Sequence, residues 1–326
     1  MPPAAPISEL VHRARDGQPR AVGRLISLIE DGHPQLPELA SALVPHTGNA
    51  QIVGFTGPPG VGKSTATSAL VSSLRAGGKR VGVLAVDPSS PFSGGALLGD
   101  RIRMGEHATD SGVFIRSMAT RGHLGGLAWA TPQAARVLDA AGFDVVLIET
   151  VGVGQSEVDV VSLADTTVVL LAPGMGDGIQ AAKAGVLEIA DVFVVNKADR
   201  DGAESVVRDL KQMISLGRKE LGSSNMGGPS WRPRIVQSVA SRDEGIDEIV
   251  ESISAHHDWM NESGELARRR QRRASSEVEA IAIERLRAEL GDLRGGDALD
   301  SLAARVVGRE LDPYAAADSL IADLGR

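Results

Sequence analysis

The chain has 326 residues, of which 42% are hydrophobic, and its formal net charge is −8. This length and composition allow a large core, arranged as one domain with additions or as two domains. The negative charge argues against nonspecific nucleic-acid binding, because phosphate backbones require a basic surface. The absence of cysteine excludes disulfides, thiolate metal sites and cysteine nucleophiles.

The first residues, Met1 to Pro6, lack the charged region and apolar core of a signal peptide. No window of the sequence reaches membrane-spanning length without charges. We therefore expect a cytoplasmic protein that has neither a membrane partner nor a nucleic-acid partner.

Residues 1–48 are predicted to form a small helical extension. Apolar residues recur there at helical spacing in two runs, which are Ile7, Leu10, Val11 and Ala14, then Val22, Leu25, Ile26 and Ile29. Ser8 is expected to cap the first helix through its hydroxyl. Three prolines, Pro34, Pro37 and Pro45, interrupt the segment that follows.

Residues 49–255 alternate between short apolar runs and longer helical ones. The predicted strands cover residues 52–56, 81–86, 113–117, 143–149, 166–172, 192–196 and 234–239. Apolar strands separated by helices predict an α/β fold with a mostly parallel sheet and helices on both faces. Ligands of such sheets bind at the carboxyl ends of the strands, where the motifs described below lie.

Residues 256–326 carry no strand signal and are predicted to be helical, with helices over 277–290, 302–307 and 313–324. The run 268–273, which leads into the first of these helices, holds five arginines. It is either a solvated helix face, which we favour, or a contact for an acidic partner or subunit. Helical flanks that make no core alone pack on the central domain or form a subunit interface, and we expect a homodimer.

A glycine-rich loop follows the first predicted strand and precedes an amphipathic helix. It reads Gly57-Pro58-Pro59-Gly60-Val61-Gly62-Lys63-Ser64-Thr65. Backbone N–H groups of such a loop, with the positive end of the helix dipole, bind triphosphate oxygens at close range. In the G-x-x-x-x-G-K-[S/T] pattern, Lys63 bridges the β- and γ-phosphates and the Ser64 hydroxyl binds Mg²⁺.

The tetrapeptide Asn196-Lys197-Ala198-Asp199 follows another predicted strand and indicates which base is bound. The Asp199 carboxylate can accept from the guanine N1–H and the N2 amine, whereas adenine has an acceptor at N1 and lacks that amine. Lys197 is expected to lay its apolar stem over the ring, and Asn196 to brace this loop against the phosphate loop. The two motifs together predict GTP and GDP as ligands.

Glu149 ends the most apolar predicted strand and is followed by Thr150-Val151-Gly152. A P-loop enzyme places an acid there to hold Mg²⁺ and a glycine whose N–H meets the γ-phosphate. We therefore assign Glu149 to the metal and Gly152 to the phosphate. Most GTPases have aspartate at the position of Glu149.

Two further acids, Asp87 and Asp100, flank a segment rich in Gly, Ser and Pro after the second strand. Either acid can bind Mg²⁺ or position the attacking water, and the segment between them is suited to change with the γ-phosphate. In the structural alternative, Asp87 caps a turn and Asp100 pairs with Arg101 or Arg103. We favour the functional assignment for both acids from their position.

The stretch from Arg116 to His123 follows the third strand and is rich in groups that can contact phosphate. His123 is equally explained as a hydrogen-bonding residue of a local turn. The other histidines show no paired spacing typical of a metal site, and we find no nickel or zinc signature.

Read together, these residues resemble the MeaB/ArgK family of P-loop GTPases, whose animal counterpart is MMAA. The resemblance covers nearly the whole chain. It is carried by the segments 57–65, 87–91 with 99–101, 149–157 and 196–199. It implies a G domain of the SIMIBI type, and the family has glutamate where other GTPases have aspartate, as at Glu149.

The resemblance also implies a function and a partner. Members of the family hydrolyse GTP to gate cofactor delivery to adenosylcobalamin-dependent methylmalonyl-CoA mutase and to protect it, as homodimers built through the C-terminal helices. A third mobile segment of the family falls on 173–183, where Asp177 and Lys183 are implied to couple the nucleotide to the mutase; a simple strand-to-helix turn explains this segment equally well. The run Ser238-Val239-Ala240 matches the loop that contacts the guanine carbonyl through backbone N–H groups.

Two other classes of function stay open from the residues. One is an ATPase or kinase serving arginine and ornithine transport, against which the Asn196 to Asp199 motif argues. The other is a metallochaperone GTPase of the nickel-enzyme type, against which the lack of cysteine and of a histidine-rich tract argues. No residue stands out as an arginine finger or as a water-orienting glutamine, so we expect slow intrinsic hydrolysis that a partner accelerates.

Overall fold

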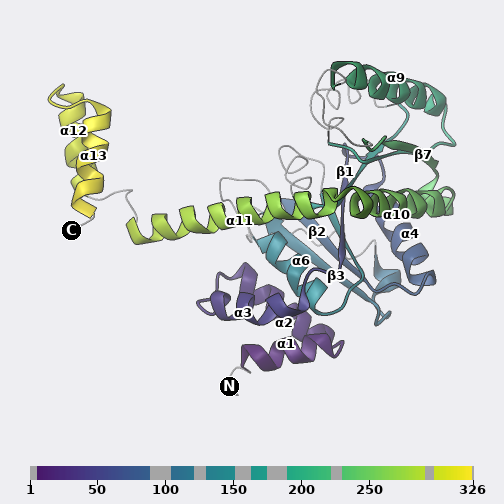
Figure 1. Ribbon diagram of the computed structural model, residues 1–326, viewed down its shortest axis with the longest axis horizontal. Coiled ribbons are helices and arrows are strands. Elements are labelled where there is room, and N and C mark those ends of the chain that lie inside the picture. The colour runs from purple at the N-terminus through teal and green to yellow at the C-terminus, as the bar shows by residue number, and fades with distance from the viewer. Residues whose placement is uncertain are drawn as a thin grey trace. The chain divides into compact units, whose positions relative to one another are not determined.

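The computed structural model describes residues 6–88, 104–120, 130–150, 163–174, 189–221, 230–290 and 297–324. Within them, seven strands form one sheet in which every neighbouring pair is parallel (Figure 1). The strands are β1 (Gln51–Thr56), β2 (Val81–Pro88), β3 (Val113–Thr120), β4 (Val145–Thr150), β5 (Thr166–Leu171), β6 (Val192–Asn196) and β7 (Arg234–Ser238). Their order is β3-β2-β4-β1-β5-β6-β7. The predicted parallel α/β sheet is therefore confirmed, with β1 between β4 and β5.

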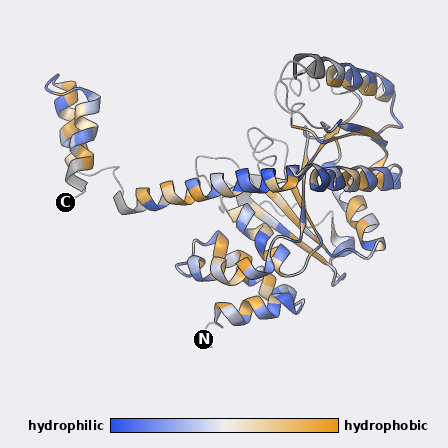
Figure 2. Cartoon of the chain, in the orientation of Figure 1, coloured by the Kyte–Doolittle hydropathy of each residue, from blue (hydrophilic) through white to orange (hydrophobic). Residues whose placement is uncertain are grey.

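Alternate residues of each central strand pack on opposite faces of the sheet. In β2, Val81 and Val83 belong to the core under α4 (Lys63–Ala76) and α10 (Ile246–Ser263), whereas Leu84 and Val86 belong to the core under α6 (Ala130–Ala140). Helix α9 (Ala203–Leu221) packs on β5 and β6. Every residue of β4, β5 and β6 is buried, and the strands appear as a hydrophobic layer in Figure 2. Helices on both faces explain these continuous apolar strands.

Three helices precede the sheet, and the apolar spacing predicted the first two of them. They are α1 (Ile7–Arg15), α2 (Pro19–Glu30) and α3 (Leu36–Leu43), followed by the short η1 (Val44–His46). Their apolar faces join the core that lies under α6. The expected cap at Ser8 is wrong, because α1 begins at Ile7 and its N-cap is Pro6, which makes no side-chain cap hydrogen bond.

The chain divides into two compact units, residues 1–267 and 268–326. Helix α11 (Glu265–Leu290) begins at Glu265 rather than near residue 277, so the arginine run 268–273 lies inside a helix instead of preceding one. In the second unit, α12 (Asp297–Val307) and α13 (Pro313–Leu324) pack against each other. The domain limits 1–48, 49–255 and 256–326 stay a prediction. No helix in the described part of the chain is long and apolar enough to cross a membrane.

Candidate nucleotide-binding site

The glycine-rich loop between β1 and α4 adopts a backbone that only glycine accommodates at two places. Gly57 has φ of 145°, and a Cβ there would lie 2.2 Å from the carbonyl oxygen of Leu170 on β5. Gly62 has φ of 93°, and a Cβ there would lie 2.7 Å from Nδ2 of Asn196 on β6. The glycines therefore allow the loop to pass close to two neighbouring strands, as a phosphate-binding loop requires.

Lys63 is the first residue of α4, and its side chain turns back over the loop. The side chain is buried, and Nζ donates to the carbonyl oxygens of Gly57 at 2.6 Å and Pro58 at 3.2 Å. The ammonium group is thus held above the loop, at the end of the helix where the backbone N–H groups are exposed. Both features favour an anion in the same place.

Ser64 and Glu149 meet beside this loop. Ser64 Oγ donates to Glu149 Oε1 at 2.7 Å, and the two residues are 8% and 3% exposed. Glu149 lies near the end of β4 and is paired in register with Phe55, near the end of β1. A hydroxyl and a carboxylate oxygen side by side are the hard ligands that Mg²⁺ prefers, so this pair fits the expected metal.

The backbone of Asp87 lies at the carboxyl end of β2, two residues after Ala85, which is paired with Glu149. This strand end adjoins the end of β4, but the Asp87 side chain lies outside the described part of the structure. The other residues assigned to phosphate, metal or switch roles that fall outside the described residues are Asp100, Gly152, Asp177, Lys183 and His123. Their roles stay predictions.

The residues assigned to the base lie next to the phosphate loop. Asn196 Nδ2 donates to the Val61 carbonyl oxygen at 2.8 Å, and Lys197 Nζ donates to that of Gly60 at 2.6 Å. Lys197 has φ of 57°, an uncommon conformation for a residue other than glycine. These contacts connect the end of β6 directly to the loop that follows β1.

Asn196 also connects the end of β7 to this site. Its Oδ1 accepts from Ser238 Oγ at 3.3 Å and from the backbone N–H of Ala240 at 3.1 Å. The backbone N–H of Val239 donates to the carbonyl oxygen of Glu244 at 3.0 Å. The N–H groups of Val239 and Ala240 thus both donate within the protein, and their contact with a guanine carbonyl stays a prediction.

Asp199 follows on an exposed turn, and its side chain is 42% exposed. Arg242, which belongs to none of the sequence motifs, forms an ion pair with this carboxylate: its Nη2 lies 3.6 Å from Asp199 Oδ2. Arg242 ends the short helix η3 (Ala240–Arg242), which follows β7. Its distance from Asp199 along the chain hides this contact from any local sequence pattern.

Arg116, which was considered for phosphate contacts, is used elsewhere. Its guanidinium contacts Glu30 in an ion pair and lies 3.2 Å from Oγ of Ser27, both on α2. The described contacts of this arginine therefore join β3 to the N-terminal helices.

One ion pair away from the loop has shifted pKa values. Arg75, near the end of α4, donates to both carboxylate oxygens of Asp110 at 2.8 and 2.9 Å. The hydrogen bonds from Arg75, with a further one from the N–H of Gly112, hold the pKa of Asp110 below its usual value. The same contact raises the pKa of Arg75. This pair joins α4 to the turn before β3.

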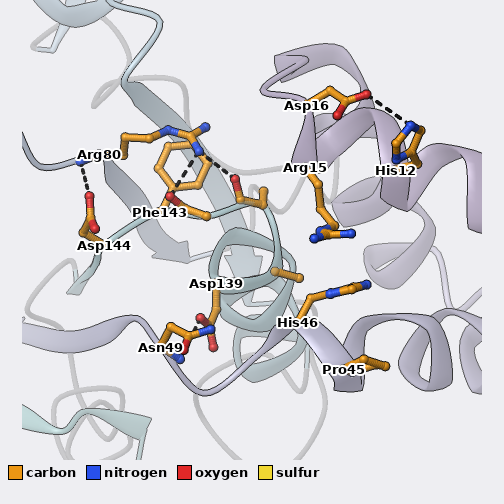
Figure 3. A pocket seen from close by; sticks show the side chains of 13 residues that line it. His12, Arg15, Asp16, Pro45, His46, Asn49, Arg80, Asp139, Phe143 and Asp144 are labelled. Carbon is orange, nitrogen blue, oxygen red and sulfur yellow. Dashed lines mark hydrogen bonds and ion pairs between the residues drawn. The ribbon is translucent and has the colours of Figure 1, made fainter.

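A cavity of about 530 Å³ lies at the opposite, amino ends of the strands. Figure 3 shows Arg15 and His46 from the N-terminal helices facing it, with Asn49, Arg80 and Asp144, which lie just before β1, β2 and β4. None of the residues assigned to phosphate, metal or base lines it. The sequence motifs therefore meet at the carboxyl edge of the sheet and not at this cavity.

Comparison with known proteins shows which family the chain resembles. Residues 22–292 match the family model described as methylmalonyl Co-A mutase-associated GTPase MeaB. A protein of Pyrococcus abyssi provisionally named a GTPase is 46% identical over 322 residues, which cover 98% of this chain and 97% of the relative. The GTPase ArgK of Escherichia coli is 36% identical over 277 residues, covering 83% and 82%.

An animal relative and a solved structure are also similar to this chain over most of its length. The mouse protein named methylmalonic aciduria type A homolog, mitochondrial, is 38% identical over 269 residues, which cover 78% of this chain and 64% of the relative. A crystal structure described as LAO/AO transport system kinase has a TM-score of 0.70 at 27% identity and covers 98% of both chains. The chain therefore belongs to the MeaB family of P-loop GTPases, enzymes that bind guanine nucleotides and hydrolyse GTP.

Proposed function

We propose that this GTPase is a chaperone of an adenosylcobalamin-dependent methylmalonyl-CoA mutase. In this proposal the nucleotide state gates loading of the cobalamin cofactor into the mutase and protects the loaded enzyme. The observation that carries it is the match of residues 22–292 to a family model whose description names that mutase. The name of the mouse relative, which refers to methylmalonic aciduria, supports the same client.

The site supports Mg²⁺-dependent hydrolysis by positioning and electrostatics. Lys63 and the loop amides would stabilise negative charge on the β- and γ-phosphates, because the loop already holds the ammonium over its carbonyl oxygens. Ser64 and Glu149 would hold Mg²⁺, with Asp87 and Asp100 as further candidates. The metal would neutralise charge on the phosphate oxygens.

Base selection in this proposal belongs to the segment from Asn196 to Asp199. The exposed carboxylate of Asp199 would accept from guanine, while Asn196 keeps the base loop and the phosphate loop in one arrangement. The base motif argues against an ATP-dependent kinase of arginine and ornithine transport, although a similar structure is described as LAO/AO transport system kinase. The helical second unit is proposed to form a homodimer in the cytoplasm.

One experiment tests the client directly. GTP and ATP turnover are measured side by side, with and without the mutase, in Mg²⁺ and in chelator, and complex formation is followed by light scattering. We expect turnover of GTP only, dependent on Mg²⁺. We expect the mutase to raise this turnover more than about tenfold, because no residue of the sequence stands out as an arginine finger or as a water-orienting glutamine and a partner can supply such a group. An enzyme that also acts on an acyl-CoA but uses no cobalamin serves as the control.

Absence of both binding and stimulation would contradict the mutase role and leave the GTPase assignment standing. Turnover of ATP at the rate of GTP would contradict the base assignment. Stimulation by the control to the same extent would show that the effect is nonspecific.

A further inference from the structure

The base site contains a cation that no motif of the sequence selects. Arg242 lies between two carboxylates: Nη2 is 3.6 Å from Asp199 Oδ2, and Nε is 3.2 Å from Glu244 Oε1. We propose that Arg242 is a positioning residue for guanine recognition, which holds the Asp199 carboxylate in the orientation that accepts the base. This inference rests on the proposed base-reading role of Asp199.

The backbone around Arg242 is fixed to the base loop by hydrogen bonds. Ala240, at the start of η3, donates its N–H to Asn196 Oδ1 at 3.1 Å, and the carbonyl oxygen of Ser238 accepts from the N–H of Ala198 at 3.0 Å. Val239 donates its N–H to Glu244 O at 3.0 Å across the turn. The hydrogen bonds that join the ends of β6 and β7 therefore also position Arg242 next to Asp199.

The turn after Arg242 is equally constrained. Asp243 has φ of 58°, and Gly245 has φ of 76°. A Cβ on Gly245 would lie 2.2 Å from the carbonyl oxygen of Gln237, so only glycine fits there. The turn brings Glu244 back beside Arg242, where its carboxylate orients the guanidinium toward Asp199.

The Asp199 carboxylate has acceptor sites for the base as well as for Arg242. A carboxylate has two oxygens with about four acceptor sites, and the contact of Arg242 with Oδ2 at 3.6 Å uses one of them. The N1–H and N2 amine of guanine can therefore be accepted while the guanidinium stays in place. Because the ion pair with Arg242 already restricts rotation of the carboxylate, Asp199 loses less conformational entropy when the base binds. The hydrogen bonds to the base therefore contribute more to affinity.

The expected effect is modest because both side chains are partly in solvent, at 53% and 42% exposure. Exposed ion pairs contribute little, so removal of Arg242 is expected to weaken GTP and GDP binding about two- to fivefold. The loss is expected mainly in KM, with a smaller change in kcat, because Arg242 acts on the base and not on the phosphates.

The test is a double-mutant cycle on the full chain, with affinities measured by isothermal titration. The single variants are Arg242→Ala, Arg242→Lys and Asp199→Asn, and Arg200→Ala is the matched control. Arg200 neighbours Asp199 in sequence, and its side chain makes no ion pair with the described residues. We expect Arg242→Ala to weaken the binding of GDP, and Arg242→Lys to lose less of this affinity than Arg242→Ala. Arg200→Ala should change the affinity for GDP less than about 1.5-fold.

The cycle closes with Arg242→Ala in the Asp199→Asn background, using xanthosine triphosphate as the probe. There the carboxylate is gone, so we expect the effect of Arg242→Ala to disappear. An equal loss in both backgrounds would overturn the inference, because it would mean that Arg242 only maintains the turn. If Asp199→Asn accepts xanthosine triphosphate but Arg242→Ala has no effect on GDP, only this inference fails. Unchanged base preference in Asp199→Asn would overturn the base-reading role itself.

Discussion

The two edges of the sheet use carboxylates for different purposes. At the amino edge, three aspartates each directly precede a strand and accept from a backbone N–H in the neighbouring strand or directly before it. Asp144 accepts from Arg80 at 2.7 Å, Asp165 from Ile52 at 3.0 Å, and Asp191 from Thr167 at 2.8 Å; Asp139 does the same for the segment 48–50. These donors belong to the main chain, so the contacts are structural.

At the carboxyl edge, the acids contact side chains instead. Glu149 accepts from the hydroxyl of Ser64, and Asp199 lies near the guanidinium of Arg242. Side-chain partners can be exchanged for a nucleotide or a metal without loss of sheet hydrogen bonds. The comparison teaches that the amino-edge aspartates satisfy the backbone at the starts of strands, whereas the carboxyl-edge acids lie next to side chains that a nucleotide or a metal can replace.

The sharpest test of the functional edge is Lys63→Ala. We expect GTP turnover to fall by about 10³-fold, because a preorganised cation on the phosphates is lost. The free energy of unfolding should change by only about 1 kcal/mol, since two hydrogen bonds to loop carbonyls disappear. Turnover and urea unfolding are measured together, with the exposed Lys211→Ala on α9 as control. Turnover like that of the unmodified chain would refute the role of Lys63.

The structural edge is tested by Asp191→Ala. Asp191 is 5% exposed, binds the N–H of Thr167, and lies 3.2 Å from Nε2 of the fully buried His256. Its removal leaves buried polar groups without this partner, so we expect a loss of about 3 kcal/mol in the free energy of unfolding. GTP affinity of the folded variant should be unchanged.

Unfolding in urea can be followed by tryptophan fluorescence, because Trp231 donates to the Asp191 carbonyl oxygen and lies beside His256. The exposed Asp201→Ala is the control. A variant of unchanged stability, or one that loses GTP affinity while remaining folded, would break the distinction between the two edges.

The smallest expected effect concerns Asp110, whose pKa is lowered chiefly by hydrogen bonds from Arg75. A lowered folded-state pKa stabilises the fold above the unfolded value of about 3.9, and this contribution is lost as pH falls through the folded value. Asp110→Asn should therefore lower the melting temperature by about 1–2 °C at neutral pH, with the difference vanishing in acid. A difference that persists or grows in acid would contradict the assignment.

Much of the fold was predictable because its signals are local. The apolar runs matched the strands, and the residues Gly57 to Thr65 and Asn196 to Asp199 fall at their carboxyl ends. The start of α11 was wrong because an arginine-rich run has helix propensity as high as the segment that follows it, so no boundary exists near residue 277. The predicted cap at Ser8 was wrong because the helix already begins at Ile7, with Pro6 at the N-cap position.

The sequence by itself determined the phosphate loop, the base motif and the alternation of strand and helix, because each depends on residues close together in the chain. Only the tertiary structure decided that Asn196 joins three strand ends, that Arg116 pairs with Glu30, and that Arg242 reaches Asp199. Those contacts depend on the strand order, which sets β1 beside β5 and β6 beside β7. Strand order follows from the packing of the whole core, and no local pattern encodes it.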